Sequence, residues 1–380
     1  MKRFLIGGVL LAVCLALLLS GVLRLGGQAS AGTQKVTTQK AAAENWYRGQ
    51  THIHANWTDP VTAMKWYRYH GYDFAAITDL NHYKPVNGLK ALFDDPGRFL
   101  VIPGVETSVE PGNKIVDVMG FGGDPAKVQM PKQMEIPAAP AAGILNYYAR
   151  SMRKAGVIPY AAHPNLNWSL TAEDILKTDP KLIRHFEIRN GEPGMNDLGG
   201  GGRLSTEELW DRVLSTGRVL YAVADDDSHH FHHFGPELTF MPNGQGVMRY
   251  PANPGRCSIY VRSPKLAIKP IVAAFNRGDF YSVCHFTSVP IKLSSYKVDK
   301  SGIQLRLPST VLADLGWAKP GENEVRYRTY FIGKGGKVLK VDQSFSPSYT
   351  FTGDELYVRV RVEDSDGGVA WTQPVFVNRL

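Results

Sequence analysis

Two histidines one residue apart stand in the segment GQTHIHANWTD, residues 49–59, and an aspartate follows the second histidine by five residues. Side chains two positions apart in a β-strand point to the same side, so His52 and His54 can aim both imidazoles at one point. Neutral imidazole is the commonest protein ligand for metals. The pattern therefore predicts either a metal site or two histidines on a polar strand edge.

Residues that bind metals also accompany the short apolar runs further along the chain. The runs FAAIT, LVIPGV, VIPYAA and VLYAVA are followed by acidic or imidazole side chains, and the run HFEI contains a glutamate. In a (β/α) barrel the carboxyl ends of the strands converge on one face, where active sites lie. Residues at six successive strand ends are therefore expected to meet: His52 with His54, Asp79, Glu106, His163, Glu187 with Asn190, and Asp227 with His229.

Imidazole and carboxylate ligands without cysteine suit zinc, manganese or iron. The set exceeds what one tetrahedral ion needs, so it predicts two or three divalent transition-metal ions. Such clusters polarise an ester oxygen and lower the pKa of a bound water to about 7. The activated water can then hydrolyse phosphate esters, carboxyl esters or amides. Taken singly, some of these acids have structural explanations, with Asp59 and Asp79 as helix N-caps and Asp225 and Asp226 as solvent-facing neighbours.

Taken jointly, the motifs resemble the PHP (polymerase and histidinol phosphatase) family over residues 46–289. The resemblance is carried by H-x-H with Asp59 five residues later, then T-D, G-V-E, A-H-P, E-I-x-N and D-S-H in that order. It implies a distorted (β/α)7 barrel with a metal cluster at the strand ends. It also implies phosphoesterase-type hydrolysis by a metal-activated water, with Asp227 and His229 as catalytic residues.

The resemblance further implies a role for each matched residue. Glu106 would bridge two ions. The implied ligands are His52, His54, Glu106 and Asp227 at a first metal, Glu106 and His163 at a second, and Asp59 and His229 at a third, and Asp79 of the T-D motif is also counted as a ligand.

The sequence departs from the family pattern at two positions. Leu80 stands where the usual T-D-H motif has a histidine after Asp79, so a third ion lacks one expected ligand. If the chain is still extended there, His82 faces the same side as residue 80 and could replace that ligand. Asp117 stands eleven residues after Glu106, where the family often has a histidine, and a carboxylate can serve as the ligand instead.

Polar residues beside the motifs are candidates for contacts to the substrate, which is expected to be a small-molecule ester. Glu187, Arg189 and Asn190 lie in and after the HFEI run. Lys84 and Arg203 could contact a phosphate, with surface ion pairing as the alternative for them and for Arg189.

The elements that must position these residues alternate along the chain. Helices are expected at Val61–His70 and Ile144–Lys154 from their apolar spacing, and Ser205 with Glu208 is typical of a capping box that begins a helix. Buried strands and helices in alternation indicate α/β architecture with parallel strands. The predicted strands are Phe74–Thr78, Leu100–Val105, Val157–Ala162, His185–Ile188 and Val219–Ala224.

The pattern changes after about residue 290. The segments IKLSSYKV, GIQLRL, VRYRTYFI and LYVRVRV alternate apolar and polar residues, with Gly and Asp at the turns. This predicts a small antiparallel β-sandwich at residues 290–380, accessory to a hydrolase barrel at 46–289. The composition, 43% apolar over 380 residues, allows a core large enough for both.

The N-terminus has the features of an export signal. Lys2 and Arg3 precede an apolar run that begins at Phe4, and Ala29-Ser30-Ala31 follows it. Residues 1–31 are therefore predicted to be a signal peptide or an uncleaved membrane anchor, and residues 32–45 a linker. The protein is expected to be exported, periplasmic or extracellular, and to contact a membrane only through an uncleaved N-terminal segment.

Charge and cysteine content limit the partners. The N-terminal 31 residues contain three basic and no acidic side chains, so their removal lowers the net charge from +8 to +5. This mild charge, without a basic run, gives no reason to expect nucleic-acid binding. Cys257 and Cys284 remain, as buried thiols or as a disulfide that export would permit.

Three functions stay open at this point. The first is an exported metal-dependent phosphoesterase. The second is a carboxyl or carbamate ester or amide hydrolase that uses the same site, because some PHP-type relatives with a similar C-terminal part act on such bonds. The third is a degenerate barrel that binds a ligand or partner without catalysis.

Overall fold

The computed structural model describes residues 45–380 apart from 57, 134, 137, 232–236, 241–246, 251–253, 286–288 and 310–323. Residues Ala43–Leu380 form one compact unit. The predicted signal or anchor and nearly all of the predicted linker lie outside the described residues. None of the described helices is long and apolar enough to cross a membrane.

A mixed sheet carries the residues of interest. Strands β1 (Asn45–Gln50), β2 (Phe74–Ile77) and β3 (Leu100–Pro111) are parallel neighbours. Strands β6 (Ile158–Ala161), β7 (His185–Asn190) and β8 (Tyr221–Asp225) form a second parallel set. β4 (Val116–Phe121) joins the two sets and is antiparallel to both β3 and β6. The expected α/β architecture with parallel strands is confirmed for these two sets, and β4 is an additional, antiparallel strand that the sequence pattern did not predict.

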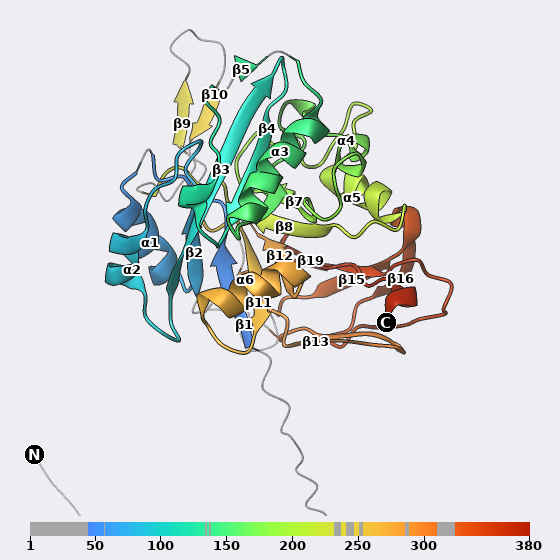
Figure 1. Cartoon of the computed structure of the whole chain (residues 1–380). Coiled ribbons are helices and arrows are strands. Elements are labelled where there is room, and N and C mark those ends of the chain that lie inside the picture. The colour runs from blue at the N-terminus through green and yellow to red at the C-terminus, as the bar shows by residue number, and fades with distance from the viewer. Residues whose placement is uncertain are drawn as a thin grey trace, which may run out of the picture. The chain divides into compact units, whose positions relative to one another are not determined.

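Helices follow the strands as the sequence predicts (Figure 1). Asp59 caps α1 by accepting hydrogen bonds from the backbone of Val61 and Thr62. Ser205 and Glu208 form the predicted capping box of α5. Among the described residues, the α-helices are α1 (Pro60–Tyr69), α2 (Asn87–Phe93), α3 (Ala141–Lys154), α4 (Ala172–Leu176), α5 (Thr206–Leu214) and α6 (Ile268–Arg277).

Closure of the sheet into the predicted barrel stays a prediction. Among the described residues, the segments that follow β1 and β8 meet at one isolated parallel bridge, between Ile53 and Ser228. The His54 N–H donates to the Ser228 carbonyl at 2.9 Å. This bridge brings His52 and His54 beside the DDDSH segment, as a shared metal site would require.

The other edge of β1 continues into antiparallel strands. β11 (Cys257–Ser263) pairs with β1, and β12 (Phe280–Cys284) pairs with β11. Cys257 lies directly opposite Cys284 in this pairing, and the two form a disulfide. The interpretation of these residues as buried thiols is therefore wrong, because the register of two strands separated by a helix brings their sulfurs together.

The C-terminal strands are antiparallel, as predicted. β19 (Val369–Thr372) pairs with β12, so the C-terminal segment and the first part of the chain share one sheet. Apolar residues of β14, β15 and β18 pack in one buried cluster, which is the packing that the predicted sandwich needs. The other strands of this segment are β13 (Ser295–Asp299), β14 (Gly302–Arg306), β15 (Tyr327–Ile332), β16 (Val338–Asp342), β17 (Ser348–Thr350) and β18 (Arg359–Asp364).

Short elements complete the described chain. β5 (Glu135–Ile136) pairs with the end of β3, and β9 (Glu237–Phe240) pairs with β10 (Val247–Tyr250). Single 3-10 turns lie at Pro125–Lys127, Leu166–Trp168, Lys334–Gly336 and Val377–Arg379. The predicted boundary at residue 289 is not tested by these elements and stays a prediction.

Candidate metal centre

The histidine pair meets two carboxylates at one buried point. The Nε2 atoms of His52 and His54 lie 3.1 Å apart. Oδ1 of Asp227 lies 3.1 Å from the first and 3.0 Å from the second, and Oε2 of Glu106 lies 3.4 and 3.2 Å from them. All four side chains are at most 4% exposed.

These spacings fit a cation. Four ligands at about 2.0–2.1 Å from a tetrahedral zinc lie about 3.3 Å from one another. The five separations that include a histidine Nε2 are 3.0–3.4 Å, which is the spacing of atoms that share one ion. Two imidazoles and two carboxylates without cysteine also match the preferences of zinc, manganese and iron. The residues present therefore fit a divalent metal ion.

A second group of ligand atoms shares Glu106 with the first. Nε2 of His163 lies 3.5 Å from Oε1 of Glu106 and 3.3 Å from Oδ2 of Asp117. Glu106 therefore directs one oxygen to each group, as a bridging carboxylate would. Asp117 comes from β4 and reaches the site because that strand is antiparallel to β3, with Asp117 opposite Ser108.

His229 adjoins the first group at its more exposed side. Its ring stacks on the ring of His54 with centroids 4.4 Å apart, and its Nε2 lies 3.9 Å from Oδ1 of Asp227. Its side chain is 16% exposed, more than the four residues of the first group. His54, Asp227 and His229 also lie close enough together to hold an ion.

Three predicted ligands lie apart from these groups. Asp59 is exposed and caps α1. Asp79 is buried, but its oxygens face the Ala55 N–H at 2.6 Å and Lys84 Nζ at 2.8 Å. His82 is exposed. Among the described residues, none of the three belongs to a set of ligand atoms that could hold an ion.

His82 is expected from the sequence to supply the ligand missing at Leu80 if the chain stays extended from residue 80 to residue 82, and the structure does not show this extended path. The chain turns at Asn81, whose φ is +51°. Leu80 pairs with Glu106 in an isolated parallel bridge, so the extended path that would aim residues 80 and 82 to one side ends at residue 80. The premise that the chain is still extended there is therefore wrong.

Glu187 and Asn190, two residues predicted to contact substrate, form hydrogen bonds to the candidate ligands. Oε1 of Glu187 lies 2.7 Å from Nδ1 of His52, and Oε2 accepts from the His163 N–H at 2.8 Å. Nδ2 of Asn190 donates to Glu187 at 3.0 Å and to Oδ2 of Asp227 at 3.1 Å. Glu187 has no exposed surface, so it cannot reach a substrate. Carboxylates behind a metal-binding histidine set its tautomer and orientation.

The three consecutive aspartates after β8 have three different positions. Asp225 accepts from the Thr51 hydroxyl at 2.8 Å and the Tyr160 hydroxyl at 2.9 Å, which fixes the start of the histidine segment. Asp226 accepts backbone N–H groups of residues 255–257 at 2.7–2.8 Å. Asp227 has φ of +49°, and this turn directs its carboxylate into the cluster. Neither Asp225 nor Asp226 is exposed, so the solvent-facing alternative is wrong.

The charges of the cluster are mutually dependent. Burial lowers the pKa of His54 and of His163, but the carboxylates around them raise it to about 9 and about 10. Burial opposes the charged form of Glu106 and Asp227, yet His52 and its neighbours hold the pKa of both well below the usual range. Burial and the nearby Glu106 raise the pKa of Asp117 to about 7. These buried carboxylates require positive charge beside them, which protons or metal ions can supply.

The sequence motifs did not identify one carboxylate beside the cluster, that of Glu192. Oε2 of Glu192 lies 3.7 Å from Nδ1 of His229. Burial, followed by the charge of Asp227, raises the pKa of Glu192 to about 8. Glu192 lies two residues beyond Asn190 in the same loop. The expectation that polar residues at strand ends belong to the site therefore also applies to Glu192.

Arg189, Arg203 and Lys84 were the basic candidates for substrate contacts. Lys84 pairs with Asp79, and Arg203 lies over the ring of Trp168 at 5.6 Å. Arg189 lines a cavity beside the cluster.

No protein-family model and no curated protein matches the sequence. Solved structures match it at low identity. A two-domain protein from Bacteroides vulgatus, described as containing a predicted PHP-like metal-dependent phosphoesterase, has a TM-score of 0.44 at 13% identity, with 87% of this chain and 96% of that chain covered. The lesion-specific endonuclease PfuEndoQ from Pyrococcus furiosus has a TM-score of 0.35 at 12% identity, with 61% and 56% covered.

A third similar structure is an amidohydrolase from Chromobacterium violaceum, with a TM-score of 0.32 at 15% identity and 49% and 88% of the two chains covered. A structure described as containing a PHP-like phosphoesterase is thus among those that this chain resembles. At these identities, interpretation of the site depends on its own residues and their spacing.

Proposed function

We propose that this chain is an exported, metal-dependent hydrolase of PHP type that acts on phosphate esters. The observation that carries the proposal is that the carboxylates of Glu106 and Asp227 both lie 3.0–3.4 Å from the Nε2 atoms of His52 and His54, in a site with almost no exposure. Buried carboxylates and imidazoles in this arrangement have a clear use as metal ligands and no evident structural one.

Two ions are the number that the ligand groups support best. His52, His54 and Asp227 would hold the first, His163 and Asp117 the second, and Glu106 would contact both. Bound divalent ions would polarise an ester oxygen and make a water acidic enough to act as nucleophile near neutral pH. The third ion has less support, because Asp59, Asp79 and His82 lie outside the groups.

The protein residues around the ions would orient groups and move protons. Glu187 orients His52, and Asn190 orients Asp227. His229 is the more exposed imidazole of the cluster and stands beside Asp227, so we assign it proton transfer at the substrate side. This retains the catalytic roles that the resemblance implies for Asp227 and His229.

Export is part of the proposal. The basic and apolar N-terminal segment supports it, and so does the Cys257–Cys284 disulfide, because disulfides persist mainly in oxidising compartments. We also propose that residues 46–289 contain the whole active site, and that residues 290–380 form an accessory domain without catalytic residues.

Metal analysis with a substrate panel tests the proposal. Protein purified with added Mn²⁺ or Zn²⁺ should contain at least two ions per chain and hydrolyse p-nitrophenyl phosphate or bis(p-nitrophenyl) phosphate faster than p-nitrophenyl acetate. His163→Ala should lower the metal content and turnover, and His70→Ala, at an exposed histidine after α1, is the matched control. Faster hydrolysis of the acetate would support the carboxyl-ester alternative. One ion or none, with no turnover, would support the non-catalytic alternative.

A further inference from the structure

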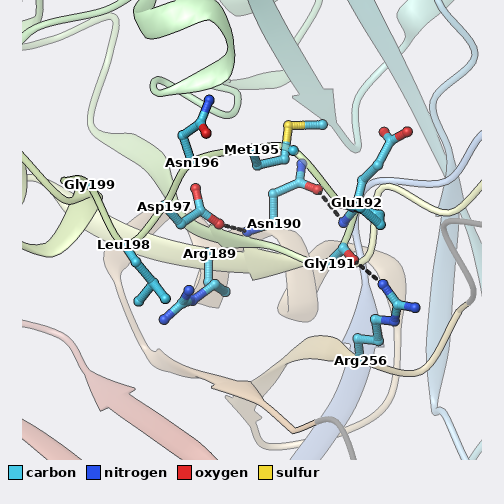
Figure 2. Close-up of a pocket in the computed structure, with 12 residues that line it drawn as sticks. Arg189, Asn190, Gly191, Glu192, Met195, Asn196, Asp197, Leu198, Gly199 and Arg256 are labelled. Carbon is cyan, nitrogen blue, oxygen red and sulfur yellow. Dashed lines mark hydrogen bonds between the residues drawn. The ribbon is translucent and has the colours of Figure 1, made fainter. Parts of the chain in front are cut away.

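A preformed cavity of about 370 Å³ lies beside the cluster, in the loop that follows β7 (Figure 2). Residues 189–199 form most of its wall, and Arg256 closes it from another segment. Asn190 and Glu192 belong both to this wall and to the surroundings of the ligands, through Asp227 and His229. The cavity therefore adjoins the proposed reaction centre.

The loop is held in shape by its own polar groups. Asp197 Oδ2 accepts from the Asn190 N–H at 2.8 Å, and Asn190 Oδ1 accepts from the Glu192 N–H at 2.8 Å. Nδ2 of Asn165 donates to the carbonyl of Asn196 at 3.0 Å. Such bonds fix the wall before a ligand arrives, which lowers the entropic cost of binding.

Two arginines give the cavity its positive charge. Arg189 has no carboxylate within ion-pair distance among the described residues, and its Nε is buried without a hydrogen-bond partner there. Its guanidinium lies over the Trp371 ring at 5.9 Å. Arg256 donates from Nη1 to the Gly191 carbonyl at 2.9 Å.

The acidic wall residues leave this positive charge in place. Figure 2 shows the Glu192 side chain directed away from both arginines. Asp197 accepts from the backbone of Asn190. Burial raises the pKa of Asp197 and the charge of Arg189 opposes this rise, although the two residues form no ion pair within 4.0 Å. Met195 and Leu198 add apolar surface to the wall. The cavity thus combines apolar lining with a guanidinium that, among the described residues, forms no ion pair within 4.0 Å.

We propose that this cavity binds the carboxylate of an ester substrate whose apolar body bears that carboxylate away from the scissile bond, with Arg189 as the residue that recognises it. Guanidinium groups bind carboxylates through paired hydrogen bonds, which neutral groups of the same shape cannot form. The inference rests on the proposed function for its claim that the ligand is part of the substrate.

Matched substrates test the inference. The substrates are phenyl phosphates that carry either a carboxylate or a carboxamide on a chain of zero, two or four methylenes. At each chain length the carboxylate and the carboxamide differ in charge but not in shape. For at least one chain length, the wild-type protein should show a kcat/KM at least about tenfold higher for the carboxylate, and in Arg189→Gln the ratio of the two kcat/KM values should fall to about one. Arg212→Gln, at an exposed arginine of α5, is the control and should leave the preference unchanged.

Direct binding separates this inference from the proposed function. Calorimetric titration of the metal-loaded protein with 4-phenylbutanoate should show tighter binding than with 4-phenylbutanamide, and Arg189→Gln should abolish the difference. Binding of this kind without hydrolysis of any phosphate ester would refute the proposed function and keep the carboxylate site. Hydrolysis without a carboxylate preference, or carboxylate binding that persists in Arg189→Gln, would overturn the inference. If Arg189→Gln is unstable, Arg189→Lys, which keeps the positive charge, replaces it in these tests.

Discussion

His52 and Glu187 are in direct contact behind the metal centre, with Nδ1 2.7 Å from Oε1 and no exposed surface on either side chain. Because Nδ1 faces this carboxylate, Nε2 is left to face the cluster. The same carboxylate accepts the His163 N–H, so a single glutamate positions one residue from each ligand group. Alignment of the two groups therefore depends on a residue that belongs to neither.

The first prediction concerns that glutamate. Glu187→Gln keeps the volume but removes the charge that fixes His52, and we expect metal affinity to fall about 10–100-fold. Competition with a chromophoric chelator measures the affinity, and circular dichroism checks the fold. Glu173→Gln, on the exposed side of α4, is the matched control. An affinity equal to that of the wild-type protein would show that Glu187 does not position the ligands.

The second prediction concerns the departure at Leu80. His82 is exposed and belongs to none of the ligand groups, so His82→Ala should leave the metal content unchanged. Activity should change less than about tenfold, or roughly 1.4 kcal/mol of barrier. Elemental analysis and initial rates measure both. Loss of about one ion per chain would instead show that the loop rearranges and that His82 binds metal.

The local sequence was sufficient to locate most of the cluster. Strand alternation places His52 and His54 on one side, and His163 and Asp227 follow the ends of β6 and β8. Glu106 joins them from inside β3, which continues to Pro111. These features depend on the periods of strands and on which ends of a sheet meet. Both can be inferred from a single sequence.

Features that depend on tertiary pairing could not be inferred in the same way. Nothing local distinguishes a glutamate that contacts substrate from one that supports a ligand, so the position of Glu187 needed the structure. The turn at Asn81 separates His82 from the cluster, and a positive φ at asparagine is allowed but not required by sequence. The antiparallel β4 follows β3 after a turn at residues 112–115 that the spacing of the apolar runs did not reveal, and the Cys257–Cys284 disulfide depends on the register of β11 with β12 across α6.

The third prediction concerns acid stability. His185 is buried, donates from Nε2 to the Phe275 carbonyl at 2.9 Å and stacks on the Phe275 ring. Burial lowers its pKa to about 3, so the unfolded chain takes up this proton at higher pH than the folded protein does. The free energy of unfolding should therefore fall as the pH drops from about 6.5 to about 3, by about 1.4 kcal/mol per pH unit from this group. Above about pH 6.5 the group should have no effect, because it is neutral in both states.

Urea unfolding of chelator-treated protein at pH 7 and pH 5 measures this contribution. Comparison with His185→Gln isolates it, because the variant keeps every other titrating group. The variant should lose less stability than the wild-type protein between the two pH values. His70→Gln, at an exposed histidine, should lose as much as the wild type. A wild-type pH dependence no steeper than that of His185→Gln would contradict the prediction.

The fourth prediction concerns the contact between α5 and the C-terminal strands. Arg359 is 1% exposed, and its guanidinium binds both oxygens of Asp211, at 2.5 and 2.7 Å, and Oε1 of Glu207 at 2.8 Å. Arg359→Met would leave Asp211 buried, and the Tyr357 hydroxyl, which donates to Oδ1, would be its remaining side-chain donor among the described residues. Removal of one partner from a buried ion pair costs about 3–5 kcal/mol, because the remaining charge stays desolvated.

Arg361→Met is the matched control, because Arg361 also pairs with Glu207 but is 27% exposed. Its loss should cost no more than about 1 kcal/mol. Urea unfolding gives both values, and the metal content of folded protein should stay unchanged in both variants, since neither arginine adjoins the ligands. Equal costs for the two variants would show that α5 and the C-terminal strands do not depend on the buried pair. Loss of metal from folded Arg359→Met protein would show that these strands also support the cluster, against an active site confined to residues 46–289.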